Sequence, residues 1–235
     1  MDVGGGLKKR LQQKHLSQQS FARILPGVNK MGCYLCESEE YTKRTGAVRD
    51  DPSINILECS GCGLVYLSSF DHIQVSHYEE SGMHKGEIPD VDSWLKTTVF
   101  DDSRRYEFVK EQVFDKDVLD FGCGVGGFLG MAKEIANTVT GVELERVLQP
   151  SFIGRGLNVF SSLEAVKKES KKFHTITAFH VIEHLKNPKE ILKNLAELLY
   201  EDGEIILEVP NSDDALLTLY DSNDFQNFTY WSQHL

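Results

Sequence analysis

The chain has 235 residues, of which 40% are hydrophobic and 26% charged, a composition that predicts a soluble protein with a buried core. Its formal net charge of −11 argues against wide contact with a nucleic-acid backbone, so nucleic acid is not an expected partner. We find no apolar run of about 18 residues and no secretory signal, so we expect no membrane span and a cytoplasmic protein.

The first 31 residues are basic and rich in glutamine. Their only acidic residue is Asp2, and the basic ones are Lys8, Lys9, Arg10, Lys14, Arg23 and Lys30. We expect residues 1–31 to form a solvated, flexible extension. A binding arm is the alternative interpretation.

Two tight cysteine pairs follow within residues 32–70. Cys33-x-x-Cys36 and Cys59-x-x-Cys62 each place two sulfurs where they can reach one metal, and together they complete a tetrahedron. The spacing therefore predicts a small structural zinc ribbon, with iron as a less usual occupant. Two disulfides or free thiols are the alternatives. Cys123 stands apart and is interpreted as a small packing residue.

Residues 71–115 are polar with scattered aromatics, and we expect a helical lid or linker with two helices around Trp94 and Tyr106. Residues 116–210 then alternate short apolar strands with amphipathic segments. The expected strands are 117–121, 138–143, 157–160, 175–179 and 204–209. This alternation predicts an α/β fold with a Rossmann-like, doubly wound, mostly parallel sheet, which binds ligands at the carboxyl ends of its strands.

Two helix starts are marked inside this region. Ser161 and Glu164 match a capping box, which predicts a helix from that point. Asn187 and Pro188 match a cap followed by proline at the first helical position.

A glycine-rich loop follows the first strand of this region. Gly122, Gly124 and Gly127 fit the G-x-G-x-x-G pattern, and glycines let a backbone turn tightly against a ligand. About twenty residues on, Glu143 ends the next strand, where a carboxylate can accept hydrogen bonds from both hydroxyls of a ribose. The pair predicts a cofactor that contains a nucleoside. A glycine turn that serves only strand–helix packing is the alternative.

Asp120 decides between the cofactors that fit this loop. It lies two residues before the first glycine, where a carboxylate would repel a pyrophosphate. The same carboxylate would attract the ammonium group of S-adenosylmethionine, directly or through water. We therefore expect S-adenosylmethionine, and an oxidoreductase that uses a dinucleotide is disfavoured.

The chain resembles the class I methyltransferases over about residues 105–235. Val118–Gly126 resembles their first motif, Val139–Glu143 the second, Ala178–Leu185 the segment after the fourth strand, and Gly203–Asn211 the fifth strand. The resemblance implies a cofactor site made by Asp120, Phe121, Gly122, Gly124, Gly126, Glu143, Leu144 and His180.

A zinc ribbon ahead of such a domain is similar to the methyltransferases that include sugar C-methyltransferases. The second knuckle, Cys59 to Tyr66, fits theirs, and Tyr78, Glu183 and His184 match positions that face substrate. The resemblance implies methyl transfer to a small-molecule acceptor, with a carbon of a sugar or nucleotide-sugar as the first expectation. We expect His184 to act as base, with Tyr78 and Glu183 orienting the acceptor.

Two other functions stay open. One is an O-methyltransferase that acts on a quinol-like hydroxyl, a family with a similar Glu-His-Leu segment. The other is a non-catalytic protein that binds the cofactor, with the ribbon serving recognition.

The resembling family continues well past residue 235, with two more strands. We therefore expect the methyltransferase domain, residues 116–235, to lack its C-terminal strands and the chain to be a fragment of a longer protein. The fifth strand, with Ile205–Leu207, would then be an open apolar edge. A homodimer that pairs this edge is the alternative, and activity of the chain itself is left open.

Overall fold

The structure is a computed structural model that describes residues 32–72 and 90–234. Two sheets organise these residues. The first contains β1, β2 and β3, and the second contains β4 to β8. The strands are β1 (Tyr41–Lys43), β2 (Ile56–Cys59), β3 (Val65–Leu67), β4 (Asp117–Phe121), β5 (Thr138–Val142), β6 (Val159–Phe160), β7 (Phe173–Phe179) and β8 (Leu199–Glu208).

The larger sheet has the order β6-β5-β4-β7-β8, and every neighbouring pair is parallel. Val118 and Leu119 in the central strand β4 have no exposed surface, because helices cover both faces of the sheet. The fold is the Rossmann-like α/β fold predicted from the alternation of strands and helices. Strand order reverses at β4, so its carboxyl end is the expected place for a ligand.

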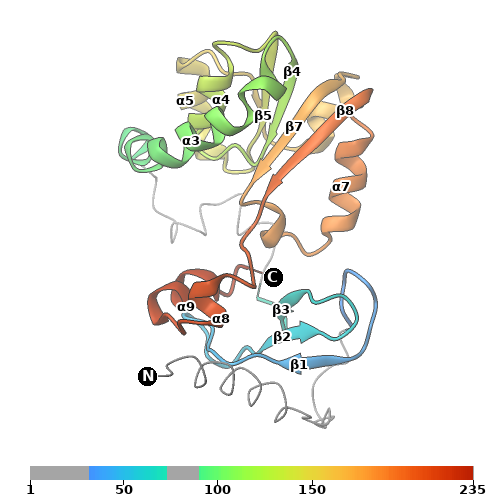
Figure 1. The fold of residues 1–235 in the computed structure, drawn as a ribbon. Coiled ribbons are helices and arrows are strands. Elements are labelled where there is room, and N and C mark those ends of the chain that lie inside the picture. The colour runs from blue at the N-terminus through green and yellow to red at the C-terminus, as the bar shows by residue number, and fades with distance from the viewer. Residues whose placement is uncertain (1–31, 73–89, 235) are drawn as a thin grey trace, which may run out of the picture.

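The helices divide between the two faces of this sheet (Figure 1). Those that cover it are α3 (Val91–Val113), α4 (Gly127–Ala132), α5 (Gln149–Gly154), α6 (Leu163–Lys168) and α7 (Pro188–Ala196), with short 3-10 turns η2 (Arg146–Leu148) and η3 (Ile182–His184). Two further helices, α8 (Ala215–Thr218) and α9 (Asn223–Thr229), lie beside the smaller sheet. Val109 and Val113 of α3 pack with Phe128 of α4 on one face. Val166 of α6 and Leu195 of α7 pack on the opposite face.

The two helices expected around Trp94 and Tyr106 are one continuous helix in the structure, α3, of 23 residues. No glycine or proline interrupts residues 91–113, and α3 packs along α4, so a single helix buries Val109 and Val113 without a break. In the described part of the chain no helix is long and apolar enough to cross a bilayer.

Two helix starts can be compared with the sequence. The capping prediction was one residue early, because Ser162 caps α6 by accepting a hydrogen bond from the Ala165 N–H at 3.2 Å. Asn187 is at the cap position of α7 and Pro188 is its first residue, as predicted. The Asn187 side chain nevertheless donates to Glu190, 2.6 Å between Nδ2 and Oε2, and does not bond the backbone.

The last strand is longer than predicted. β8 begins at Leu199 and pairs with β7 from Phe173 to Phe179. The prediction missed its start because residues 199–203 are mostly polar and exposed. Leu199 pairs with Phe173, and regular pairing resumes at Glu204 opposite Thr175 after an irregularity in the register. Within the described residues β8 pairs with β7 alone.

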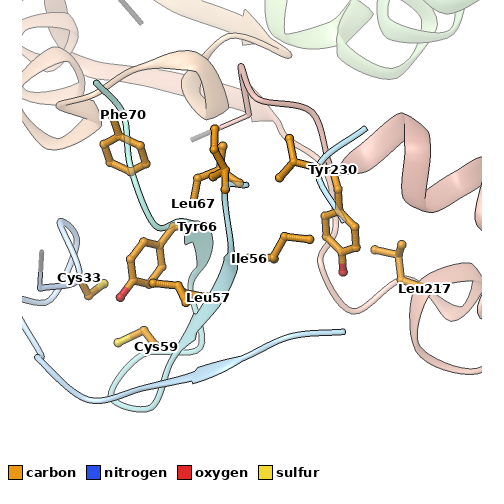
Figure 2. Packing of buried hydrophobic residues seen from close by; sticks show 11 residues of the cluster. Cys33, Ile56, Leu57, Cys59, Tyr66, Leu67, Phe70, Leu217 and Tyr230 are labelled. Atoms are coloured by element: carbon orange, nitrogen blue, oxygen red, sulfur yellow. The ribbon is translucent and has the colours of Figure 1, made fainter. Parts of the chain in front are cut away.

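The smaller sheet carries the cysteine module. β1, β2 and β3 are antiparallel, and their apolar side chains form a core with Tyr66, which has 2% exposure, at its centre. Figure 2 shows Tyr66 beside Cys33 and Cys59. The four cysteines and this small core thus lie in one unit.

Residues 215–234 lie beyond the large sheet and pack against the cysteine module. Figure 1 shows α8 and α9 beside β2, and Figure 2 shows Leu217 and Tyr230 approaching Ile56. Both side chains belong to the core of the module. Asp50 also accepts two hydrogen bonds from Ser232, at 3.0 Å from its N–H and 2.7 Å from its hydroxyl. The two ends of the described chain therefore share one core.

We predict that Tyr230→Ala lowers the free energy of unfolding by about 3 kcal/mol, because truncating a buried aromatic leaves a cavity. Tyr230 is 6% exposed, whereas Tyr220 is 74% exposed, so Tyr220→Ala is the matched control and should change little. Urea unfolding followed by circular dichroism measures both. Equal midpoints for the two variants would contradict the packing of the tail on the module.

Candidate functional site

A cavity of about 290 Å³ opens at the carboxyl ends of β4, β5 and β7. Parallel pairing sets Phe121 opposite Val142, so the loops after β4 and β5 leave the sheet at the same edge. The residues that line the cavity include Trp94, Asp102, Arg105, Asp120, Phe121, Gly122, Gly124, Glu143, Leu144, His180, Val181 and His184. The helix α3 supplies one wall and the segment after β7 supplies another.

The loop from β4 to α4 needs its glycines. Gly122, Gly124 and Gly126 all have φ between 52° and 74°, a region that side chains avoid. A Cβ on Gly122 would also overlap the Val181 side chain. Gly126 is the cap of α4 and lies behind the cavity wall, since it is not among the lining residues.

The carboxylate of Glu143 joins this loop to the end of β5. One oxygen accepts the Gly124 N–H at 2.8 Å, and the other accepts the Glu145 N–H at 2.9 Å. Burial raises the pKa of Glu143, although these N–H groups oppose the shift. An acidic side chain is thus held in the wall at the edge of the glycine loop, where a sugar hydroxyl can reach it.

Asp120 is buried at the base of the cavity, with 3% exposure. Thr177 donates to it, 2.8 Å between Oγ1 and Oδ1. Burial raises the pKa of Asp120 to about 7, and the negative charges of Asp102 and Glu143 add to the shift while Arg105 opposes it. A cationic ligand group would relieve this accumulation of negative charge.

The sequence did not point to Asp102 or Arg105 in α3. Asp102 is buried, which raises its pKa, and Arg105 Nη1 lies 3.6 Å from its Oδ1. Arg105 also binds Glu208, with 3.0 Å between Nε and Oε2. Their one signal in the sequence is an acidic–basic pair three residues apart, which is common on exposed helices.

His180 lies directly after β7 with φ of 55°. Its Nδ1 is 2.8 Å from Glu183 Oε1 and its Nε2 is 3.1 Å from Glu208 Oε1. The Glu183 contact is the main cause that raises the pKa of His180. The ring therefore links the two carboxylates at the cavity edge.

His184 meets the tail that packs on the cysteine module. Its Nδ1 is 2.8 Å from the Gln233 carbonyl oxygen, and its ring contacts Trp231 and His234 at centroid distances of 6.1 and 5.0 Å. Burial lowers the pKa of His184, so its neutral form is favoured. A neutral imidazole in a cavity wall can accept a proton or bind a cation.

The four cysteines gather in one cluster. Their sulfurs lie within 4.8 Å of one another, with Cys33 3.6 Å from Cys62 and Cys36 3.4 Å from Cys59. These distances exclude disulfides, whose sulfurs are about 2.05 Å apart. They are close to the separation of about 3.8 Å expected for thiolates around tetrahedral zinc. The donor set therefore fits a structural zinc ion.

Comparison with known proteins identifies the family of the large domain. A sequence profile described as "Methyltransferase domain" matches residues 93–235. The chain belongs to this methyltransferase domain family. The match includes all of α3 except its first two residues, the whole large sheet and the tail. The family's S-adenosylmethionine cofactor agrees with the one expected from Asp120 and the glycine loop.

Two curated relatives are named ubiquinone biosynthesis O-methyltransferase. The one from Salmonella paratyphi A is 32% identical over 109 residues, covering 42% of this chain and 44% of the relative. The one from Escherichia coli O6:H1 is 27% identical over 154 residues, covering 60% and 62%. The chain thus spans about half the length of the curated relatives it matches.

Solved structures give weaker similarity. An O-methyltransferase family protein from Burkholderia thailandensis has a TM-score of 0.49 and 14% identity, covering 67% of this chain and 52% of that one.

The structure brings most of the predicted site residues of this methyltransferase domain together. Of the predicted cofactor residues, all but Gly126 line one cavity, and so does His184. Glu183 lies behind the wall, bonded to His180. Tyr78 lies outside the described residues. The roles assigned to these residues stay predictions.

We predict that Gly122→Ala lowers affinity for S-adenosylhomocysteine at least about tenfold, because a Cβ there needs strained backbone and collides with Val181. Gly130→Ala in α4 is the matched control, since a Cβ there meets open space. It should retain affinity and gain about 0.5–1 kcal/mol of stability. Isothermal titration calorimetry measures the affinities, and loss of binding in both variants would contradict the prediction.

We also predict that Asp120→Asn stabilises the ligand-free protein more at pH 8 than at pH 5. The raised pKa of about 7 means that the folded state holds this proton more tightly than the unfolded state, whose carboxyl has a pKa near 3.8, so wild-type stability falls as pH rises from about 4 to 7 and then levels off. Asparagine still accepts the Thr177 hydrogen bond and carries no charge. The gain should be ~3 kcal/mol larger at pH 8, measured by urea unfolding at both pH values. Asp202 is exposed, so Asp202→Asn is the control and should change stability little at either pH. If Asp120→Asn stabilised the protein equally at pH 5 and pH 8, the raised pKa of Asp120 would be contradicted.

Proposed function

We propose that this chain transfers the methyl group of S-adenosylmethionine to a small-molecule acceptor. The observation that carries the proposal is the acidic frame of the cavity, in which Glu143 bonds the glycine loop while Asp120 is buried at its base. A carboxylate at the end of the second strand suits the ribose hydroxyls, and Asp120 suits the ammonium group of the methionine part. Phe121, Leu144 and His180 complete the walls.

We assign to His184 the role of the base on the side of the cavity where the methyl acceptor would bind. Methyl transfer at a sulfonium requires an aligned acceptor and, for a poor nucleophile, removal of a proton. A neutral imidazole in the cavity wall suits that proton, and Glu183 lies behind it with Tyr78 as a further expected contact. We propose a carbon of a sugar or nucleotide-sugar as the target, on the resemblance of the cysteine module and the Glu183-His184 pair.

O-methylation of a quinol-like hydroxyl is the second candidate. The curated relatives from Salmonella paratyphi A and Escherichia coli O6:H1 are named for an O-methyltransferase reaction in ubiquinone biosynthesis. The same His184 would then take a hydroxyl proton. The two acceptors differ in the atom methylated, so mass spectrometry of a product distinguishes them.

The proposed role of the cysteine module is to hold zinc as a structural ion. Four thiolates leave no open position for a reactant, so the metal supplies stability and no chemistry. The Gly61 N–H lies 3.3 Å from Cys59 Sγ and would stabilise a thiolate charge. A rigid module would in turn support the tail residues that contact His184.

Calorimetric titration with S-adenosylmethionine, S-adenosylhomocysteine and NAD tests the proposed cofactor. We expect micromolar binding of the first two and none of NAD. Glu143→Gln should weaken the binding at least about tenfold, because it removes the carboxylate that would accept hydrogen bonds from the ribose hydroxyls of the cofactor. The exposed Glu134→Gln is the control. Binding of NAD alone, or of none of the three, would contradict the proposal.

We predict one zinc ion per chain by elemental analysis of the purified protein. Cys36→Ser should lose it and lower the unfolding temperature, because metal binding and folding of such modules are coupled. Cys123→Ser should keep the zinc, because Cys123 lies in the cavity wall and outside the cluster. Wild-type protein that is purified without zinc, and whose unfolding temperature does not change when zinc is added, would contradict the zinc assignment.

A further inference from the structure

We propose that Glu183, His184 and His234 bind a divalent transition-metal cation at the acceptor side of the cavity. The inference rests on the proposed function and assigns a ligand to the same site. One ligand atom from each of the three side chains lies within 4.8 Å of the other two. The three come from η3 and from the tail, so only the folded chain brings them together.

Glu183 supplies a carboxylate oxygen that needs a partner. Its side chain is 9% exposed, and Oε1 bonds His180 Nδ1 at 2.8 Å. Oε2 is buried and has no hydrogen-bond partner among the described residues. A buried carboxylate oxygen without a partner is costly, and a cation would satisfy it.

Both histidines are oriented as metal ligands are. His184 Nδ1 is 2.8 Å from the Gln233 carbonyl oxygen, and His234 Nδ1 is 2.7 Å from the Thr229 carbonyl oxygen. A carbonyl oxygen can only accept, so each Nδ1 carries the hydrogen and each neutral ring has its lone pair on Nε2. Histidines that bind metals usually donate their other N–H to a carbonyl or carboxylate in this way.

The cysteine module holds His234 in place. The Arg49 N–H donates to the Tyr230 carbonyl at 2.9 Å, and Asp50 accepts two hydrogen bonds from Ser232. The Arg49 guanidinium also lies 4.5 Å from the centre of the Trp231 ring. A ligand on a segment fixed at several points loses little conformational entropy when a cation binds.

The chemistry of the ligands selects the cation. Two imidazoles and one carboxylate suit Co²⁺, Zn²⁺, Fe²⁺ or Mn²⁺, whereas Mg²⁺ and Ca²⁺ prefer oxygen ligands. Three protein ligands leave positions open, and His184 lines the cavity. An acceptor oxygen at an open position would become more acidic or more polarised. With the cation bound, His184 acts as a ligand and not as the proton acceptor.

Titration with Co²⁺ tests this site. The protein is first loaded with one equivalent of Zn²⁺, which the four thiolates take because they bind zinc more tightly than imidazole–carboxylate sets. We expect one Co²⁺ per chain by calorimetry, and affinity lower by about tenfold or more in Glu183→Gln and His234→Ala. His174→Ala, at the opposite edge of the sheet, is the matched control and should bind as wild type does.

Binding of S-adenosylhomocysteine is measured in the same samples. Variants that keep it but lose Co²⁺ support the cation site, because their fold is intact. Wild type that binds S-adenosylhomocysteine and no Co²⁺ overturns the cation site alone and leaves His184 as proton acceptor. Equal Co²⁺ affinity in wild type and both ligand variants overturns it too. Co²⁺ binding that depends on these residues, without any cofactor binding, contradicts the proposed function and not this site.

Discussion

The geometry of the cavity depends on the two hydrogen bonds that Glu143 accepts. The side chain stands at the end of β5 and bonds the Gly124 N–H in the loop after β4, as well as the Glu145 N–H in its own loop. Parallel pairing brings both loops to one edge, and the carboxylate then ties them together. Without that tie, a loop with three glycines at positive φ would have many accessible conformations, and the space beside it would lose its shape.

A consequence of this frame is that negative charge accumulates in a small volume. Asp120, Asp102 and Glu143 all face the cavity, and burial raises the pKa of each. Arg105 partly compensates, although it also binds Glu208. By Coulomb's law, such a site would repel a pyrophosphate and attract a cationic ligand. The sulfonium and ammonium groups of S-adenosylmethionine have that charge, which agrees with the family of the domain.

The cysteine module and the cavity are connected through the tail. Leu217 and Tyr230 complete the core of the module, and the residues that follow Tyr230 return to η3, where His234 and Trp231 contact His184. The module is therefore the support on which the His184 side of the cavity is built. A zinc ion bound by the four thiolates would affect the cavity indirectly, because it would make the cysteine module rigid.

The sequence by itself determined the parallel sheet, the glycine loop, the acidic end of the second strand and the cysteine cluster. Each of these rests on local signals, namely alternation of apolar runs, residues that tolerate positive φ, and short spacing. It did not determine the single helix α3 or the start of β8, because packing against α4 and backbone pairing with β7 decide those. Only the tertiary structure placed Asp102 and Arg105 in the cavity and brought His234 to His184, 50 residues away in the chain. Contacts between distant segments depend on the surfaces that the whole chain buries together, and no short stretch of sequence carries that information.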